Sequence, residues 1–345
     1  SNRINSIRQM EVNDMKIIKK YSAGILLTVI LAYVSMFISD LIPEKLISAG
    51  VFSLLLGMAI NPIISNYNIL NEGMSFVSKK VLRLAIILMG ATLSFSQVFE
   101  VGKYSLIVMT FTLFAAFAGG YYLGKLFNMN WKLSGLISAG TGICGGSAVA
   151  AIAPTIDAEA NDIAYAISAT FIFDIVMVVL FPIAGRYFGM SDLGYGLWTG
   201  TAVNDTSSVV AAGYAFSDAA GNFSLIVKLT RTLSIVPAVL VFSFINERLN
   251  SKYNISNAKK EKIDLKKIFP WFIVIFLLMV GIKSLGIISA SVSTKISIVS
   301  KFFMVMSLGA IGLKTNFKEV SKSGFLPMLH GFIISLLVVV VSFMV

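Results

Sequence analysis

Charged residues are scarce in this sequence. Asp, Glu, Lys and Arg make up 13% of its 345 residues, 57% are hydrophobic, and the mean hydropathy is +0.85. Soluble proteins carry about 25% charged residues, so the composition predicts an integral membrane protein and excludes an ordinary soluble enzyme. The longest polar stretch after the N-terminus is 246–267. We therefore expect a cytoplasmic segment at 1–20 and a single polytopic membrane domain over 21–345.

Cysteine and histidine are almost absent. A single cysteine, Cys144, excludes a disulfide framework and a cysteine-based metal site. The one histidine, His330, is distant from Cys144 in the chain, so no nucleophile and base fall together. We expect no enzymatic activity, no cofactor and no metal centre, and we place His330 at the inner membrane interface.

The excess of basic residues has two readings. A net charge of +11 is typical of nucleic-acid-binding proteins, but in membrane proteins Lys and Arg gather on the cytoplasmic side and contact lipid headgroups. The high hydropathy favours the second reading. We therefore expect the lipid bilayer as a partner and no nucleic acid, with the basic loop 246–267 in the cytoplasm.

Apolar stretches recur along the chain. A transmembrane helix needs about 20 mostly apolar residues. Most of the 28 Lys and Arg residues then fall on one side of the predicted crossings, which places the N-terminus inside and the C-terminus outside. The eleven predicted segments are 21–39, 46–65, 80–97, 104–126, 133–155, 163–185, 193–213, 219–245, 268–288, 296–313 and 324–345.

Two of these segments, 133–155 and 193–213, are poor helices at their centres. Glycines break the first, and a run of polar residues from Asn204 to Ser208 breaks the second. In hydrocarbon, irregular backbone survives only where protein or a water-filled cavity satisfies its N–H and C=O groups. A pair of interrupted segments is the best sequence indication of a transport site. Whether each crosses fully or is re-entrant stays open.

A short internal similarity indicates an inverted repeat. Gly90 to Lys103 aligns without gaps with Gly309 to Lys322, with matching Gly, Ala, Glu, Val and Lys. In the predicted topology the two copies run in opposite directions. Inverted repeats are typical of secondary transporters with alternating access.

Lys228, Arg231, Asp205 and Asp174 lie in the central parts of predicted membrane segments. Lys228 and Arg231 are three apart on one helix face, and they predict an anion-binding pair. The alternatives are a structural ion pair with Asp205 or Asp174, or snorkelling to the outer interface. Asp205 predicts a proton acceptor or, with nearby hydroxyls, a Na⁺ ligand. Asp174 is a second candidate proton carrier.

Small residues at the two breaks complete the candidate site. Glycines let backbone N–H groups approach an anion, and hydroxyl groups add hydrogen bonds. The alternative is tight helix packing through small residues. The pattern Gly140-x-Gly142-x-x-Gly145 matches a dinucleotide fingerprint but lacks a preceding strand. The residues assigned to substrate binding are Lys228, Arg231, Thr141, Cys144, Gly145, Gly146, Ser147, Asn204, Thr206, Ser207 and Ser208.

Several motifs together resemble a known family, the bacterial sulfate exporter family of YeiH-like membrane proteins. The resemblance rests on Leu82–Gly90, Leu93–Gln97, Ile143–Ser147, Val209–Gly213 and Lys228-x-x-Arg231 through Pro237. It implies an all-α fold of about ten to eleven helices with inverted repeats and unwound helices, similar to the bile-acid/sodium symporter and cation/proton antiporter groups. It also implies that the protein is located in the bacterial cytoplasmic membrane. Many members carry His before the acid, where this chain has Asn204.

The leading hypothesis is a secondary transporter of a small anion, sulfate or a related sulfur oxyanion or organic anion, coupled to H⁺ or Na⁺ through Asp205. One rival is a Na⁺ or H⁺ antiporter with Asp205 as its ion site. Another is a membrane sensor or structural subunit without transport. A homodimer is an open alternative, because Gly57, Asn61 and Pro62 suit either a dimer face or a gate.

Overall fold

The computed structural model describes residues 2–41, 48–252, 269–315 and 324–345, with backbone only for 2–19. Every regular element in these ranges is helical, so the predicted all-α class is confirmed. The helices form two compact units. Unit 1 comprises Ser1–Thr92 and Ile275–Asn316, and unit 2 comprises Leu93–Val274 and Phe317–Val345.

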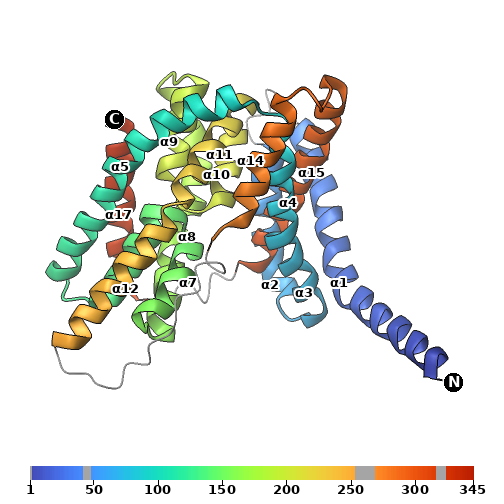
Figure 1. Ribbon diagram of the computed structural model, residues 1–345, viewed down its shortest axis with the longest axis horizontal. Helices are drawn as coiled ribbons and strands as arrows, with labels where there is room; N and C mark the ends of the chain where they lie inside the picture. The colour runs from blue at the N-terminus through green and yellow to red at the C-terminus, as the bar shows by residue number, and fades with distance from the viewer. Residues whose placement is uncertain (1, 42–47, 253–268, 316–323) are drawn as a thin grey trace. The chain divides into compact units, whose positions relative to one another are not determined.

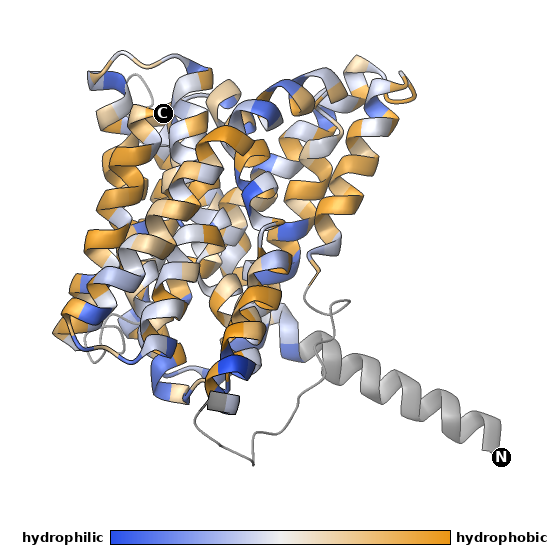
Figure 2. Cartoon of the chain, turned by 60° about the vertical axis from the view of Figure 1, so that its left-hand side comes forward, coloured by the Kyte–Doolittle hydropathy of each residue, from blue (hydrophilic) through white to orange (hydrophobic). Residues whose placement is uncertain are grey.

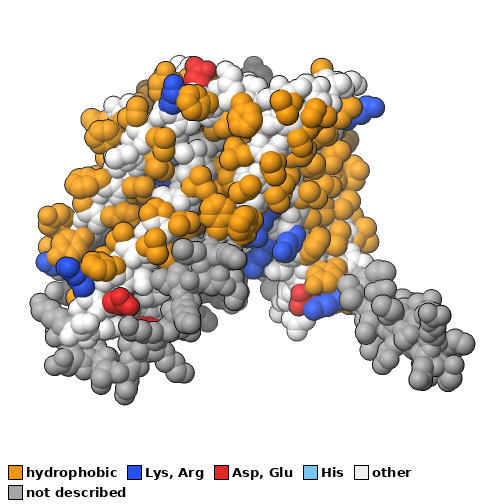
Figure 3. All heavy atoms as spheres, viewed as in Figure 1, with side chains coloured by type: hydrophobic (Ala, Val, Ile, Leu, Met, Phe, Trp, Pro, Cys, Tyr) orange, Lys and Arg blue, Asp and Glu red, His pale blue; other side chains and the backbone are white. Residues whose placement is uncertain are grey.

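The helices have the length and surface of membrane-spanning segments. Large apolar side chains lie on their outer faces: Phe114, for example, is 75% exposed. Figure 2 shows hydrophobic residues along the lengths of the helices, and Figure 3 shows apolar side chains on the face in view, which is the surface expected of helices in contact with lipid. In the described ranges, six helices are long and apolar enough to cross a membrane: Lys20–Leu41, Phe95–Leu126, Ala160–Tyr187, Asp218–Ser251, Ala290–Lys314 and Phe325–Met344.

Unit 1 is built around close packing of α2 against α15. A Cβ atom on Gly57 would lie 2.6 Å from the carbonyl oxygen of Gly309, so the two backbones touch where side chains are absent. Nearby, the Asn61 Nδ2 donates a hydrogen bond to the carbonyl of Leu313 at 2.7 Å. The elements of this unit are α1 (Asn2–Leu41), α2 (Ala49–Ile64), α3 (Asn68–Phe76), η2 (Val77–Val81), α4 (Leu82–Gly90), most of α14 (Trp271–Ser284) and α15 (Ala290–Lys314).

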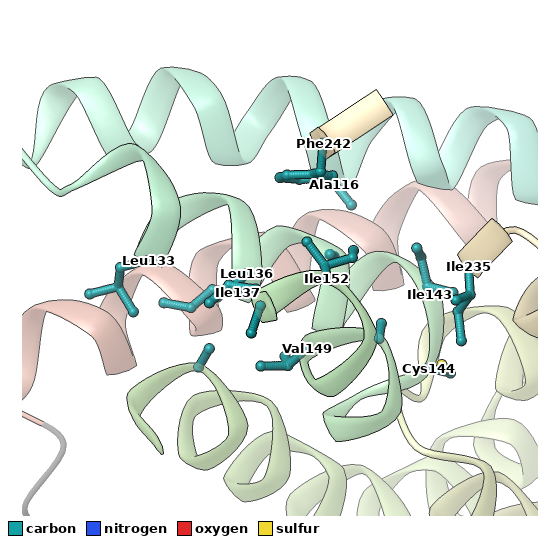
Figure 4. Close-up of a cluster of buried hydrophobic side chains, with 14 of the residues drawn as sticks. Ala116, Leu133, Leu136, Ile137, Ile143, Cys144, Val149, Ile152, Ile235 and Phe242 are labelled. Atoms are coloured by element: carbon teal, nitrogen blue, oxygen red, sulfur yellow. The ribbon is translucent and has the colours of Figure 1, made fainter. Parts of the chain in front are cut away.

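Unit 2 contains both interrupted segments. Its main apolar core gathers around the first of them, with Ile137, Ile143, Val149 and Ile152 buried (Figure 4). The elements are α5 (Phe95–Leu126), α6 (Trp131–Ala139), η3 (Gly140–Cys144), α7 (Gly146–Ile152), η4 (Ala153–Ile156), α8 (Ala160–Tyr187), α9 (Asp192–Ala202), α10 (Thr206–Phe216), α11 (Asp218–Thr232), α12 (Ile235–Lys252) and α17 (Phe325–Met344).

Some predicted boundaries are wrong. The segment predicted at 80–97 ends at Gly90, and the next helix, predicted from 104, begins at Phe95. The cause is a capping box at Ser94, whose hydroxyl accepts the Gln97 N–H while the Gln97 side chain accepts the Ser94 N–H. Residues 246–252 of the predicted loop are also helical, as the end of α12, and 253–267 lie outside the described residues.

The inverted repeat stays a prediction. Gly90 is the last residue of α4 and the chain leaves the helix after it, whereas Gly309–Lys314 continues α15. Residues 316–322 of the second copy lie outside the described residues. The aligned segments therefore differ in conformation where they can be compared.

Candidate functional site

The first interruption lies between α6 and α7. The helix widens into π-type turns over Gly140–Cys144, and Gly145 then adopts a φ of +63°, which L side chains rarely adopt. Gly140 also lies close to α8, since a Cβ atom there would sit 2.7 Å from the Thr170 methyl carbon. The glycine cluster thus provides both the unusual backbone conformation at Gly145 and the close approach to α8.

The second interruption lies between α9 and α10. Helix α9 ends at Ala202, Val203 is extended, and Asp205 caps the N-terminus of α10. The Asp205 carboxylate accepts the Ser207 N–H at 2.9 Å and the Ser207 hydroxyl proton. Asp and Ser are favoured at this position because their side chains satisfy N–H groups that have no partner within the helix.

The two interruptions meet inside unit 2. A Cβ atom on Gly145 would lie 3.3 Å from the Cβ of Asp205, so the two turning points of the backbone are in contact. Helix α11, which carries Lys228 and Arg231, packs against α9 and α10 (Figure 1). Two segments predicted separately from sequence therefore form one site.

Arg231 and Lys228 bind the carbonyl ends of both interrupted helices. Arg231 donates through Nε to Gly142 O at 2.5 Å, through Nη2 to Thr141 O at 2.6 Å, and through Nη1 to Thr201 O. Lys228 Nζ donates to Ile143 O at 2.9 Å and to Val203 O at 3.0 Å. Both side chains are fully buried.

These contacts explain how the broken backbone persists within an apolar unit. The last carbonyls of a helix have no partner within it and carry its negative dipole end. Here two cations from one face of α11 satisfy five such carbonyls. Among the described residues no ion pair joins Lys228 or Arg231 to an acid, since the salt bridge found there is Lys20–Glu72. Both side chains are fully buried and bind carbonyls inside the unit, an arrangement that favours neither an ion pair nor snorkelling.

Asp174, on α8, accepts hydrogen bonds from backbone N–H groups at the start of α10, whereas Lys228 and Arg231 donate to carbonyls. Its two carboxylate oxygens accept the N–H groups of Asn204 at 2.7 Å and Asp205 at 3.0 Å, and the side chain is buried. A carboxylate is favourable beside the positive end of a helix. The structure thus places anions at the N–H side of the second break and cations at the carbonyl side.

Only part of the site is accessible. Gly146, Asp205 and Thr206 are partly exposed and Ser147 is exposed. Among the described residues no acceptor binds the N–H groups of Gly146, Ser147 or Thr206. The remaining sequence-predicted residues are buried, namely Thr141, Cys144, Gly145, Asp174, Asn204, Ser207, Ser208, Lys228 and Arg231. The residues of the site that are at least partly exposed therefore carry N–H groups without acceptors, two hydroxyls and one carboxylate.

Three features of unit 2 were not expected from sequence. The Thr170 carbonyl accepts a long hydrogen bond from the Asn204 Nδ2, at 3.4 Å. The Thr141 hydroxyl and the Asn204 Oδ1 are buried without a hydrogen-bond partner. His330 is also buried, with Nε2 3.1 Å from both the Ser134 hydroxyl and the Gly120 carbonyl. His330 thus lies buried between α17, α5 and α6, and its position at the inner membrane interface stays a prediction.

Comparison with known proteins gives the family. A family described as "Conserved hypothetical protein 698" matches residues 23–331. The chain belongs to this family. A relative from Clostridium tetani, named "UPF0324 membrane protein", is 73% identical and aligns over 96% of this chain and 98% of its own length. A relative with the same designation from Streptococcus pneumoniae serotype 4 is 39% identical and aligns over 92% of this chain and 94% of its own length. Another, from Fusobacterium nucleatum, is 37% identical and aligns over 90% of this chain and 92% of its own length.

The names of the UPF0324 relatives are consistent with the membrane-spanning helices described above. Their printed names call them membrane proteins, and this chain has six helices of membrane-spanning length and composition in its described ranges. It is a multi-pass membrane protein. The names mention neither sulfate nor transport, so activity has to be argued from the site.

Proposed function

We propose that this protein is a secondary active transporter of a small anion across the bacterial cytoplasmic membrane. Sulfate, a related sulfur oxyanion or an organic anion is the substrate class, and H⁺ or Na⁺ is the coupling ion. The N-terminus is cytoplasmic and the C-terminus external. The anion and the coupling ion meet at the two helix breaks of unit 2.

One observation carries the proposal: two broken helices touch in the interior of a membrane protein and leave N–H groups without acceptors at an accessible surface. Such N–H groups bind anions because they point outward with the positive end of the helix dipole behind them. The charges of Lys228 and Arg231 lie beneath this surface. In the described conformation both side chains bind carbonyls, so their contribution to anion affinity is electrostatic.

Individual residues take distinct roles in this proposal. The N–H groups of Gly146, Ser147 and Thr206, with the Ser147 hydroxyl, bind the anion directly. Asp205, partly exposed on the same surface, accepts the coupling proton or cation. Protonation of Asp205 would remove a negative charge beside the anion, which favours binding of anion and proton together.

The exposure of Asp205 also favours a second candidate, a Na⁺ or H⁺ antiporter. Its carboxylate lies on the accessible surface while the two basic side chains are already bound to carbonyls. An antiporter would move cations through Asp205 without any anion. A sensor or structural subunit would show neither flux.

Labelled sulfate uptake into proteoliposomes under imposed pH and Na⁺ gradients distinguishes these functions. The proposal predicts gradient-driven sulfate uptake that unlabelled sulfite or thiosulfate inhibits, and an Asp205→Asn protein that exchanges sulfate but no longer accumulates it. Proton or sodium movement without sulfate dependence, abolished in Asp205→Asn, would instead establish the antiporter. No flux of any kind would reject both.

A further inference from the structure

Lys228 has an unusual environment for a buried lysine. Its ammonium group donates to two carbonyl oxygens, Ile143 O and Val203 O, from the two different breaks. The side chain is fully buried, and no acid lies within ion-pair distance among the described residues. Buried charges are normally paired with an opposite charge or coordinated. Here the compensation comes from backbone carbonyls.

Unwound carbonyls and half-helix C-terminal ends are the ligands that transporters use to bind monovalent cations. Additional oxygen atoms are available at the same breaks, because the Thr141 hydroxyl and the Asn204 Oδ1 are buried and lack partners. The other ionisable groups that act electrostatically on Lys228 are Arg231 on its own helix, Cys144, Asp174 and Asp205. The ammonium group thus has two carbonyl oxygens as acceptors, and two further oxygens without partners belong to residues of the same breaks.

We infer that Lys228 is a tethered cation that fills a monovalent-cation site formed by the carbonyls of both helix breaks. In this role its ammonium group replaces a bound ion such as Na⁺ or K⁺ and neutralises the negative ends of the two half-helices. This inference deepens the proposed function: transport needs no Na⁺, and the proton becomes the coupling ion.

Removal of the tethered ammonium group tests the inference. A Lys228→Ala protein has space for a free cation among the same oxygens, so its melting temperature should fall and should recover in Na⁺, K⁺ or methylammonium chloride relative to choline chloride at equal ionic strength. A Lys228→Met protein keeps the side-chain volume and should show no such recovery. Absence of any cation-specific recovery in Lys228→Ala, or equal recovery in choline, would overturn the inference.

Lys132→Ala serves as the matched control. The ammonium group of Lys132 also donates a hydrogen bond to a backbone carbonyl, Asp157 O at 2.8 Å, but Lys132 is partly exposed and lies at the start of α6. This variant and the wild-type protein should show no specific dependence of melting temperature on Na⁺, K⁺ or methylammonium. A similar response in Lys132→Ala would mean that the cations act on the surface.

A second measurement tests the role of Lys228 as a tethered cation if Lys228→Ala does not fold. Sulfate uptake by the wild-type protein under a pH gradient should be the same, within about twofold, when Na⁺ is replaced by N-methylglucamine. Uptake that requires Na⁺ would overturn the inference while leaving anion transport intact. If the wild-type protein carries no sulfate, the proposed function fails and the wild-type melting temperature decides the inference: a rise specific to Na⁺ or K⁺ relative to choline would overturn it.

Discussion

Arg231 forms more hydrogen bonds within the site than any other side chain among the described residues. Its guanidinium binds three carbonyls, from Thr141, Gly142 and Thr201. The planar fork of an arginine reaches several acceptors at fixed angles, which a lysine ammonium group cannot reproduce. Arg231 therefore holds the end of the first interrupted helix against the end of the second.

An Arg231→Ala protein should be strongly destabilised. Each buried carbonyl left without a donor costs about 1–3 kcal/mol, so three together should cost roughly 3 kcal/mol or more. Arg231→Lys should recover only part of the loss. Thermal unfolding in detergent measures both, with Arg248→Ala as the control because Arg248 is exposed and stacks over Phe244. An Arg231→Ala protein that unfolds at the wild-type temperature would contradict this role.

Two elements, α8 and the break between α9 and α10, are joined through Asp174. Its carboxylate accepts two successive backbone N–H groups, those of Asn204 and Asp205. An asparagine side chain offers one acceptor oxygen, and its NH₂ group would face the other N–H. The geometry of the break thus requires a carboxylate on this face of α8.

Asp174→Asn should lower the melting temperature and reduce sulfate uptake, because one buried N–H loses its acceptor at a cost of about 1–3 kcal/mol. Glu100 is exposed on α5, so Glu100→Gln should change neither the melting temperature nor sulfate uptake. Wild-type stability and uptake in Asp174→Asn would show that Asp174 does not hold the break.

The existence and place of the two breaks could be predicted from sequence. The glycine cluster ending at Gly146 and the polar run from Asn204 contradict a continuous apolar helix, and both interruptions are confirmed. The ends of α4 and α5 were missed even though the Ser94–Gln97 capping box is visible in the sequence. Counting apolar residues gives no weight to such local signals.

The partners of Lys228 and Arg231 could not be predicted from sequence. Their carbonyl acceptors lie 25 to 90 residues away along the chain, and every residue type carries the same backbone carbonyl. Charge reasoning considers Asp174 and Asp205 as partners because only side chains are distinct in a sequence. The tertiary contact between the two breaks determines which groups Lys228 and Arg231 bind.

At the scale of the whole molecule, the predicted topology has an odd number of crossings. The N- and C-termini should therefore lie on opposite sides, with the C-terminus, at the end of α17, outside. Alkaline phosphatase fused to the C-terminus of the protein in a bacterial host should be active, and a green fluorescent protein fused there should be dark. If the green fluorescent protein fusion is bright and the phosphatase fusion is inactive, the C-terminus lies in the cytoplasm and the predicted orientation is wrong.

In the proposed function, the accessible backbone at the helix breaks binds the transported anion. Gly146→Ala tests it with little structural cost, because the added Cβ would lie 3.8 Å from Ile167, in ordinary contact. The new methyl group is bonded to the Cα next to the Gly146 N–H, where we expect it to hinder the approach of an anion. Gly102→Ala on α5 is the matched control, since a Cβ atom there meets nothing within 4 Å.

The decisive measurement is the initial rate of labelled sulfate uptake into proteoliposomes under a pH gradient, for both variants at equal protein content. We predict that Gly146→Ala reduces the rate at least about tenfold, with a melting temperature close to that of the wild-type protein, and that Gly102→Ala leaves both unchanged. A Gly146→Ala protein that transports sulfate at the wild-type rate would contradict the account.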